Sequence, residues 1–145
     1  MAAKAHSPEA MSEIVIFDTS VIVDQIRTNR HLDRLLNVSG NVRNSSVVLA
    51  ELWRGVSSTV DRKTIEALER NHPTLTPTPN NWLETGHLLA KMRTDKGFER
   101  HKLRDLHFDV LIALTARAHG ARVITSNRAD FELICDYREF KLEVW

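Results

Sequence analysis

The sequence predicts an α/β domain built on a mostly parallel central sheet. Two observations support this expectation. Residues 14–17 form a continuous apolar run, which is typical of a strand buried on both faces. Along the rest of the chain, strand-like segments alternate with longer segments whose apolar residues recur at helical spacing. Such alternation favours parallel strands joined by right-handed crossovers.

The first elements follow directly from this pattern. The strand at residues 14–17 leads into a helix that Thr19 or Ser20 is expected to cap, because their hydroxyls can accept from free amides. A shorter helix is expected at residues 32–36. Residues 42–45 form a weaker strand candidate.

Two further helices and a break are expected next. Ser45 or Ser46 caps the first helix, whose apolar positions at helical spacing are Val48, Leu49, Leu52, Trp53 and Val56. Residues 61–70 form the second helix. Three prolines between residues 72 and 79 exclude a helix, so this stretch is expected to be a short edge strand and a loop.

The second half of the chain continues the alternation. A long helix is expected to begin at Asn80 or Asn81 and to stop near Gly97, because glycine ends helices readily. The remaining elements are a helix at 107–119, a strand at 122–125, a helix at 129–134 and a strand at 140–144. In parallel sheets of this kind, ligands bind beyond the carboxyl ends of the strands.

Length and composition limit the classes of protein. A chain of 145 residues with 42% hydrophobic residues is expected to form one domain with a single core, at residues 13–145. Residues 1–12 contain no apolar stretch and are expected to be a disordered leader rather than a secretory signal. No apolar run is long enough to span a membrane.

Cysteine content and charge add two further limits. The single cysteine, Cys135, excludes an internal disulfide framework and a cysteine-rich zinc site, which favours a cytoplasmic location. The formal net charge of +1 does not by itself indicate a nucleic-acid partner. Any such indication must come from how the charges are distributed.

Four acidic residues, far apart in the chain, are candidates for one shared site: Asp18, Glu51, Asp109 and Asp130. A carboxylate at the mouth of a buried strand loses solvation and needs a partner. Four converging carboxylates would repel each other unless a cation lay between them. Hard oxygen donors suit Mg²⁺ or Mn²⁺, so this pattern predicts a metal-dependent site that cleaves phosphodiesters.

Each acid also has a simpler explanation than a shared site. Asp18 can be an ordinary helix cap, and Asp109 and Asp130 can be acids in the first turn of a helix, where the helix dipole favours them. Glu51 lies within an apolar helical stretch and has no such role, although it could pair with Arg54 or Arg104. Four coincidences are less probable than one common site.

Asp105 is a possible additional ligand. It lies one helical turn before Asp109 if the predicted helix starts early. The simpler expectation, and the one favoured here, is a surface pair with Arg104 or Lys102.

Blocks of sequence around the four acids resemble the PIN-domain ribonucleases, and more narrowly the VapC-type toxins of toxin–antitoxin pairs. The matching blocks run in family order, cover nearly the whole chain from residue 14 onward, and comprise residues 16–22, 48–56, 109–116, 119–121 and 123–131. The Asp-Thr-Ser start is weak alone, and the blocks are specific together. The resemblance implies a three-layer α/β/α domain with helices on both faces of the sheet.

The resemblance also implies an activity and its residues. It implies RNA cleavage at a Mg²⁺ or Mn²⁺ site formed by the four acids. Thr19, Thr125 and Asn127 are implied as supporting polar groups around the metal and the phosphate. A VapB-type antitoxin and a homodimer are the implied protein partners.

The expected mechanism is attack of a metal-activated water on the RNA phosphodiester, with Asp18 and Asp109 as the main ligands. Residues 91–104 carry six basic and two acidic side chains, a net +4 just ahead of Asp109. Arg100, Lys102 and Arg104 in this stretch are therefore candidates for phosphate contacts. The simpler explanation for any one of them is a solvated helix face.

Other functions fit the sequence less well. A haloacid-dehalogenase-type phosphatase needs a second aspartate two residues after Asp18, where this chain has Ser20. A response-regulator receiver domain needs paired acids and a late lysine that have no clear match. A catalytically inactive PIN-fold binding module would usually lack one of the acids. A housekeeping RNA-processing nuclease of the same fold is the alternative, and the small size favours the toxin.

Overall fold

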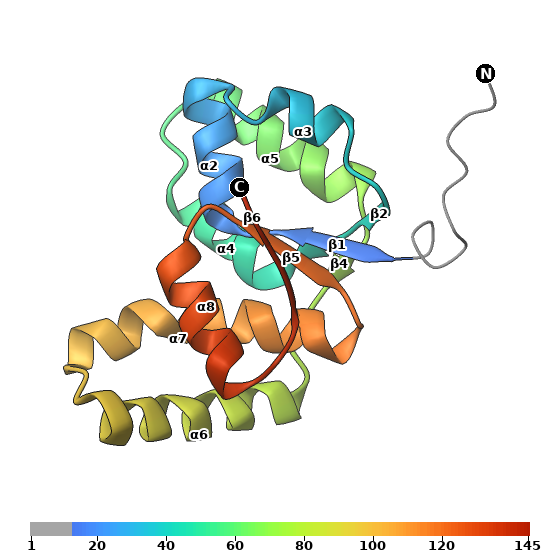
Figure 1. The fold of residues 1–145 in the computed structure, drawn as a ribbon. Coiled ribbons are helices and arrows are strands. Elements are labelled where there is room, and N and C mark those ends of the chain that lie inside the picture. Colours follow the sequence, from blue (N-terminus) through green and yellow to red (C-terminus); the bar gives the residue numbers. More distant parts are fainter. Residues whose placement is uncertain (1–12) are drawn as a thin grey trace.

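The computed structural model describes residues 13–145, and a four-stranded sheet lies at its centre (Figure 1). All neighbouring strands are parallel, which confirms the predicted fold class. Across the sheet the strands are β2 (Asn41–Val42), β1 (Ile14–Phe17), β5 (Arg122–Thr125) and β6 (Lys141–Val144). A leader at residues 1–12 was expected, and these residues lie outside the described part of the chain.

Helices cover both faces of this sheet, as a three-layer domain requires (Figure 1). Above it in the view lie α2 (Thr19–Thr28), α3 (Leu32–Leu36) and α5 (Thr59–Asn71). Below it lie α6 (Pro79–Lys96), α7 (Arg100–Ala118) and α8 (Arg128–Tyr137). The remaining helix, α4 (Ser46–Arg54), packs against α2, α5 and α7. A small separate sheet pairs β3 (Asn44–Ser45) with β4 (Thr74–Leu75).

The second half of α7 forms the centre of the core. Its residues 110–116 are all buried, from Val110 to Ala116, and Leu106 one turn earlier is fully buried as well. A helix segment that is apolar on all sides is stable only when other elements surround it. Ile16 of β1, Val123 of β5 and Leu52 of α4 belong to the same buried cluster. This arrangement holds the ends of β1 and β5 beside the middle of α7.

The helix after β1 starts differently from the prediction. Asp18 is its N-cap residue, and Thr19 and Ser20 lie in the first turn, so neither is the cap. The Asp18 side chain makes no capping bond to α2. Instead, its Oδ2 accepts hydrogen bonds from the hydroxyls of Ser20 and Thr125, and the carboxylate stays at the carboxyl end of β1.

The prediction for α7 was wrong at its start. The helix begins at Arg100 and not at residue 107, so Asp109 lies in its tenth position. Asp109 is therefore not in a first helical turn, and the stabilisation expected there from the helix dipole does not apply. Its place in the middle of α7 removes the simple explanation for this acid.

Smaller corrections concern other boundaries. The strand expected at 42–45 is divided into β2 and β3, on either side of Arg43. The long helix α6 begins at Pro79, with Thr78 as its cap, because Thr78 and Asn81 form a reciprocal capping box. Its end at Gly97, in a left-handed conformation, is as predicted. The Ser45 cap of α4 is also confirmed, through its bond from the Val48 amide.

Gly40 makes the approach to β2 possible. Its φ is +109°, and a Cβ at this position would lie 2.6 Å from the carbonyl oxygen of Glu13. Only glycine fits this close approach of two backbones.

Within residues 13–145, no helix is long and apolar enough to cross a membrane.

Candidate metal centre

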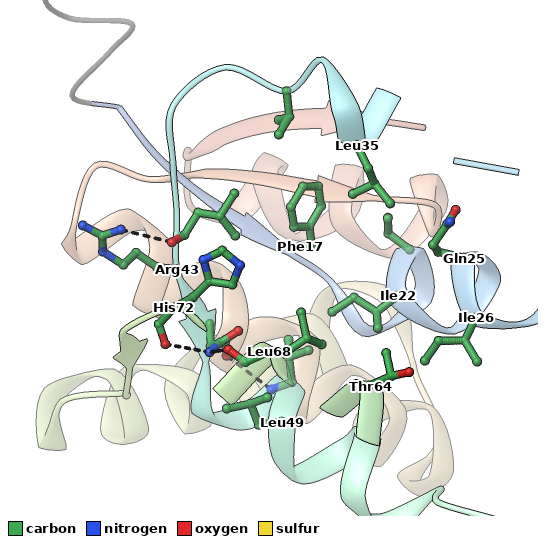
Figure 2. Close-up of a pocket in the computed structure, with 16 residues that line it drawn as sticks. Phe17, Ile22, Gln25, Ile26, Leu35, Arg43, Leu49, Thr64, Leu68 and His72 are labelled. Atoms are coloured by element: carbon green, nitrogen blue, oxygen red, sulfur yellow. Dashed lines mark hydrogen bonds between the residues drawn. The ribbon is translucent and has the colours of Figure 1, made fainter. Parts of the chain in front are cut away.

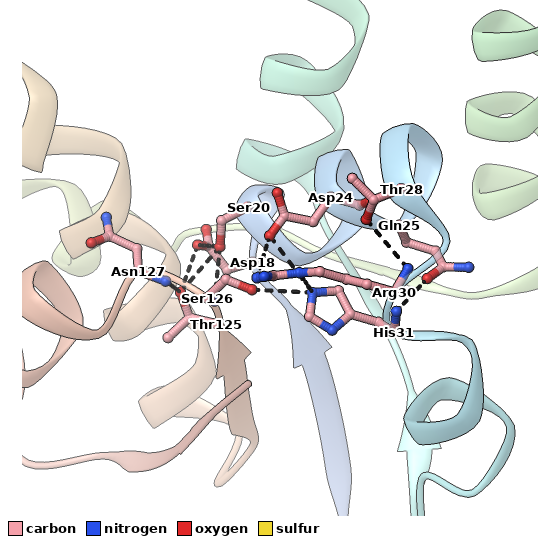
Figure 3. A network of polar contacts seen from close by, with 10 residues as sticks. All are labelled: Asp18, Ser20, Asp24, Gln25, Thr28, Arg30, His31, Thr125, Ser126 and Asn127. Carbon is pink, nitrogen blue, oxygen red and sulfur yellow. Dashed lines mark hydrogen bonds and ion pairs between the residues drawn. The ribbon is translucent and has the colours of Figure 1, made fainter.

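Asp18 is a buried carboxylate at the carboxyl end of β1, with only 3% of its surface exposed. Its amide donates to the carbonyl of Ile124 in β5 at 2.8 Å, which continues the β1–β5 pairing by one residue. Its Oδ2 accepts hydrogen bonds from Ser20 Oγ at 2.7 Å and from Thr125 Oγ1 at 2.8 Å (Figure 3). The predicted supporting role of Thr125 is thus a direct contact to Asp18.

The second oxygen of Asp18 is the unusual one. Oδ1 is buried and has no hydrogen-bond partner within residues 13–145. Burial raises the pKa of Asp18 above its ordinary value of 3.8, and the hydrogen bonds from Ser20 and Thr125 offset only part of this effect. A buried carboxylate oxygen without a donor is costly, and a cation would satisfy it.

Glu51 reaches the same region from α4. Its side chain is half-buried, and its Oε1 accepts a hydrogen bond of 2.8 Å from Thr19 Oγ1. Burial raises the pKa of Glu51, the bond from Thr19 lowers it, and the negative charge of Asp18 raises it again. Within residues 13–145 Glu51 forms no ion pair with Arg54 or Arg104; Arg54 lies over the ring of Phe108 at 5.8 Å, and its charge lowers the pKa of Glu51 only in part.

Asp109 has the most perturbed carboxyl group of the four. Its pKa is raised from 3.8 to about 8, first because it is buried and then because Asp18, Glu51 and Asp130 repel its charge. Lys102 offsets part of this repulsion. The three other acids all act on Asp109, so the structure brings the four predicted residues into one electrostatic cluster.

Asp130 lies in the first turn of α8, as predicted, and is held by two partners. Its Oδ1 is 2.7 Å from Lys102 Nζ, and its Oδ2 accepts from Asn127 Nδ2 at 3.1 Å. Asn127 also caps α8, because its Oδ1 accepts from the Asp130 amide. The amide of Asn127 in turn donates to Thr125 Oγ1 at 2.9 Å. Asn127 therefore connects Asp130 to the segment that contacts Asp18.

The chemistry of this cluster fits a divalent cation. Its donors are carboxylate oxygens, one of them is buried without a partner, and burial together with the charges of the other acids raises the pKa of Asp109 to about 8. The described side chains do not form a preassembled cage of three or more ligands. A cation of Mg²⁺ or Mn²⁺ type would satisfy the free oxygen and relieve the repulsion.

The three basic residues predicted to contact phosphate have different environments in the structure. Lys102 lies inside the cluster, bonded to Asp130, whereas Arg100 and Arg104 are exposed. The favoured surface pairing of Asp105 is not what forms, because Lys102 pairs with Asp130 instead. Asp105 is exposed and makes no ion pair with any residue of the described chain. It is one turn from Asp109 on the solvent side of α7.

Two serines that the sequence reasoning did not place in the site belong to it. Ser20 donates to Asp18, and the Ser126 amide donates to Ser20 Oγ at 3.0 Å. The spacing of Asp18 and Ser20 at the start of a helix was a usable signal, since it places a hydroxyl beside the carboxylate. Ser126 had no such signal, because its contact depends on the pairing of β1 with β5.

A cavity of about 320 Å³ has none of the four acids in its lining (Figure 2). It is enclosed by α2, α3, α4 and α5 and lined mainly by apolar side chains, including Ile22, Leu35 and Leu68. It offers no carboxylate to a cation, so it is distinct from the metal centre.

Comparison with known families agrees with this architecture. The PIN domain model matches residues 15–136, which include all four acids. A search of curated proteins found no significant match.

Solved structures show the same fold at low sequence identity. The VapBC2 complex of Rickettsia felis, bound to a DNA fragment from its promoter, contains a chain with a TM-score of 0.67 and 24% identity, covering 91% of this chain and 98% of that one. FitAB bound to an IR36 DNA fragment gives 0.64 and 18%, with 90% and 94% covered. A toxin–antitoxin complex from Klebsiella pneumoniae gives 0.57 and 21%, with 81% and 89% covered. At these identities the similarity establishes the fold.

Proposed function

This chain belongs to the PIN domain family, and on that premise we propose that it is a metal-dependent endoribonuclease acting as the toxin of a toxin–antitoxin pair. The observation that carries the proposal is the convergence of four carboxylates, in which Asp18 keeps a buried oxygen without a partner and burial and the three other acids raise the pKa of Asp109 to about 8. Groups perturbed in this way gather at functional sites. Here the perturbing groups are the same acids that a cation would bind.

The four acids would divide the work of holding the metal. Asp18, with its free buried oxygen, and Asp109 would bind the cation most directly. Glu51, oriented by Thr19, and Asp130, oriented by Asn127, would complete the shell directly or through water, since Mg²⁺ keeps several waters. When bound, the ion supplies a water of lowered pKa that serves as the nucleophile on phosphorus.

Basic side chains beside the cluster would hold the RNA backbone. Arg100 and Arg104 are exposed on α7, and Lys102, between them in the sequence, pairs with Asp130. Phosphate contacts of this kind give affinity that falls as salt is added, without reading the base sequence. The proposed substrate is therefore RNA bound through its backbone along the start of α7.

The toxin role and its partner are proposed from the structural neighbours. Those proteins are described as VapBC2, FitAB and a toxin–antitoxin complex. By analogy of fold, this chain would be restrained by a VapB-type antitoxin and would form a homodimer. A short neighbouring gene for a DNA-binding protein, whose product blocks cleavage, would support the toxin over a housekeeping RNA-processing nuclease.

The direct test is cleavage of total RNA by the purified protein. We expect cleavage with Mg²⁺ or Mn²⁺ and none after EDTA treatment, with activity restored when the metal is returned. Cleavage that continues equally in EDTA would exclude the metal mechanism. Absence of cleavage with either metal, together with retained RNA binding, would favour the inactive binding module.

A further inference from the structure

The polar network around Asp18 extends beyond the carboxylates to a buried histidine, His31, between α2 and α3 (Figure 3). Its surface is only 4% exposed. A buried imidazole costs free energy unless its nitrogens have partners. The partners of His31 therefore indicate what this residue does.

One ring nitrogen of His31 faces three polar groups. Nε2 lies 3.3 Å from Ser126 Oγ, accepts from Arg30 Nε at 3.2 Å, and is 3.6 Å from Asp24 Oδ2. Arg30 Nη2 bonds the same Asp24 oxygen at 2.8 Å. Because Arg30 Nε can only donate, Nε2 is the unprotonated ring nitrogen, and the Ser126 hydroxyl is the donor in its contact to His31. The contact to Ser126 therefore needs an acceptor at the position of Nε2.

The imidazole ring is also fixed by aromatic packing. Its centroid lies 5.5 Å from that of Trp145, which in turn lies 5.6 Å from Phe17, the residue before Asp18. The Trp145 amide donates to the carbonyl of Thr125 at 2.8 Å. His31 therefore packs against a residue that is bound to the segment after β5.

From Ser126 the network leads to the metal centre in two bonds. The Ser126 amide donates to Ser20 Oγ at 3.0 Å, and Ser20 Oγ donates to Asp18 Oδ2 at 2.7 Å. The neighbouring Thr125 hydroxyl bonds the same oxygen of Asp18. With Oδ2 occupied by these two hydroxyls, Oδ1 is the oxygen left free for a cation.

We propose that His31 is a positioning residue for the metal centre. Through Ser126 it fixes residues 125–127, and with them the hydroxyls that decide which oxygen of Asp18 faces the cation. The expected effect of His31 on metal binding rests on the proposed function. Its effect on the conformation of residues 125–127 is independent of that function.

Two substitutions separate the polar contact from the ring packing. His31→Gln places an amide where Nε2 lies and can still bond Ser126, but it loses the ring that stacks on Trp145. His31→Phe keeps a ring against Trp145 and removes the nitrogen. A purely structural role predicts that Phe is tolerated better than Gln, because it preserves the packing and buries no polar group. The positioning role predicts the opposite order for metal binding.

The measurements are Mn²⁺ affinity and amide hydrogen exchange at residues 126–128, both on the folded full-length protein. We expect His31→Phe to weaken Mn²⁺ binding by about threefold to tenfold, the range of one lost hydrogen bond, and to speed exchange at these amides. His31→Gln should retain most of the Mn²⁺ affinity and most of the protection of these amides from exchange. An exposed serine away from the site, Ser57, provides the control as Ser57→Ala.

A double-mutant cycle tests whether the effect passes through Ser126. Ser126→Ala removes the hydroxyl that faces Nε2, so adding it to His31→Phe should cause little further loss of Mn²⁺ affinity. Additive effects of the two changes, or a Gln variant no better than Phe, would overturn the proposal. If wild-type protein binds no Mn²⁺, the metal function is wrong. The exchange rates then still decide whether His31 holds residues 125–127.

Discussion

Thr19 and Glu51, 32 positions apart, are joined by a hydrogen bond of 2.8 Å from Thr19 Oγ1 to Glu51 Oε1. This bond links the start of α2 to the middle of α4, and it orients the Glu51 side chain. Thr19→Val keeps the shape and removes the donor, whereas Thr19→Ser keeps the donor. We expect the valine variant to lose about threefold to tenfold in RNA cleavage rate, and the serine variant to stay near wild type. Equal activity of the two would show that this bond does not orient Glu51.

Asp18→Asn should abolish cleavage and leave the fold intact. The amide keeps the size of the side chain but removes a buried negative charge, so the thermal midpoint should be unchanged or higher while activity falls about a hundredfold or more. Circular dichroism and a thermal melt check the fold, and an RNA cleavage assay measures activity. The matched control is Asp105→Asn, an exposed acid one turn before Asp109. Full activity of the Asp18 variant would remove this residue from the centre.

The perturbed pKa of Asp109 predicts how stability depends on pH in the metal-free protein. Its folded pKa of about 8 lies above the ordinary 3.8, so the folded state holds a proton that the unfolded state has released between these values. Stability must therefore fall as pH rises through this window, by roughly 1.4 kcal/mol per pH unit at most. Thermal melts in EDTA at about pH 6 and pH 8 should differ by several degrees. In Asp109→Asn the difference in thermal midpoint between the two pH values should shrink. An unchanged difference would show that other groups cause the pH dependence.

Divalent metal should reverse that dependence. A cation that binds only the folded, ionised cluster stabilises it by an amount set by its concentration relative to the dissociation constant. Because protons compete for the same carboxylates, Mn²⁺ should raise the thermal midpoint more at about pH 8 than at pH 6. Asp109→Asn should weaken this response. A rise of equal size at both pH values would indicate binding elsewhere on the protein.

Lys102 should affect metal and RNA in opposite directions. It pairs with Asp130 at 2.7 Å, so Lys102→Met frees an acid for the cation and makes the cluster more negative. Loss of the Lys102 charge raises the pKa of Asp109 further, so at a pH well above 8, where Asp109 is ionised in both proteins, Mn²⁺ should bind several-fold more tightly while RNA binds more weakly. Arg104→Met, an exposed position, should weaken RNA binding alone. Weaker Mn²⁺ binding in the Lys102 variant would contradict this interpretation.

Much of the fold could be predicted because its strands have strong local signals. The apolar run at residues 14–17 and the strand at 122–125 are found where expected, in a parallel sheet. The start of α7 was missed because residues 100–105 are mostly charged and exposed, so the apolar pattern of this helix begins only at Leu106. That error gave Asp109 a false place in a first turn.

The residues proposed for the site could be named from the sequence, whereas the contacts between them could not. The four acids and their supporting residues follow from the sequence blocks, and each supporting group contacts one of the acids. The pairing of Lys102 with Asp130 and the burial of His31 arise between segments distant in sequence. Local patterns contain no information about such contacts, because they exist only after the sheet has formed.

The order of the strands also affects when the site can exist during synthesis. β5 lies between β1 and β6, yet it is made from residues 122–125, more than a hundred residues after β1. A nascent chain that has emerged only as far as residue 120 holds three of the four acids but lacks the strand that pairs with β1 and bears Thr125. Contacts between segments so distant form late in folding. The candidate centre can therefore form only once β5 and α8 have been made, when translation of the domain is nearly finished.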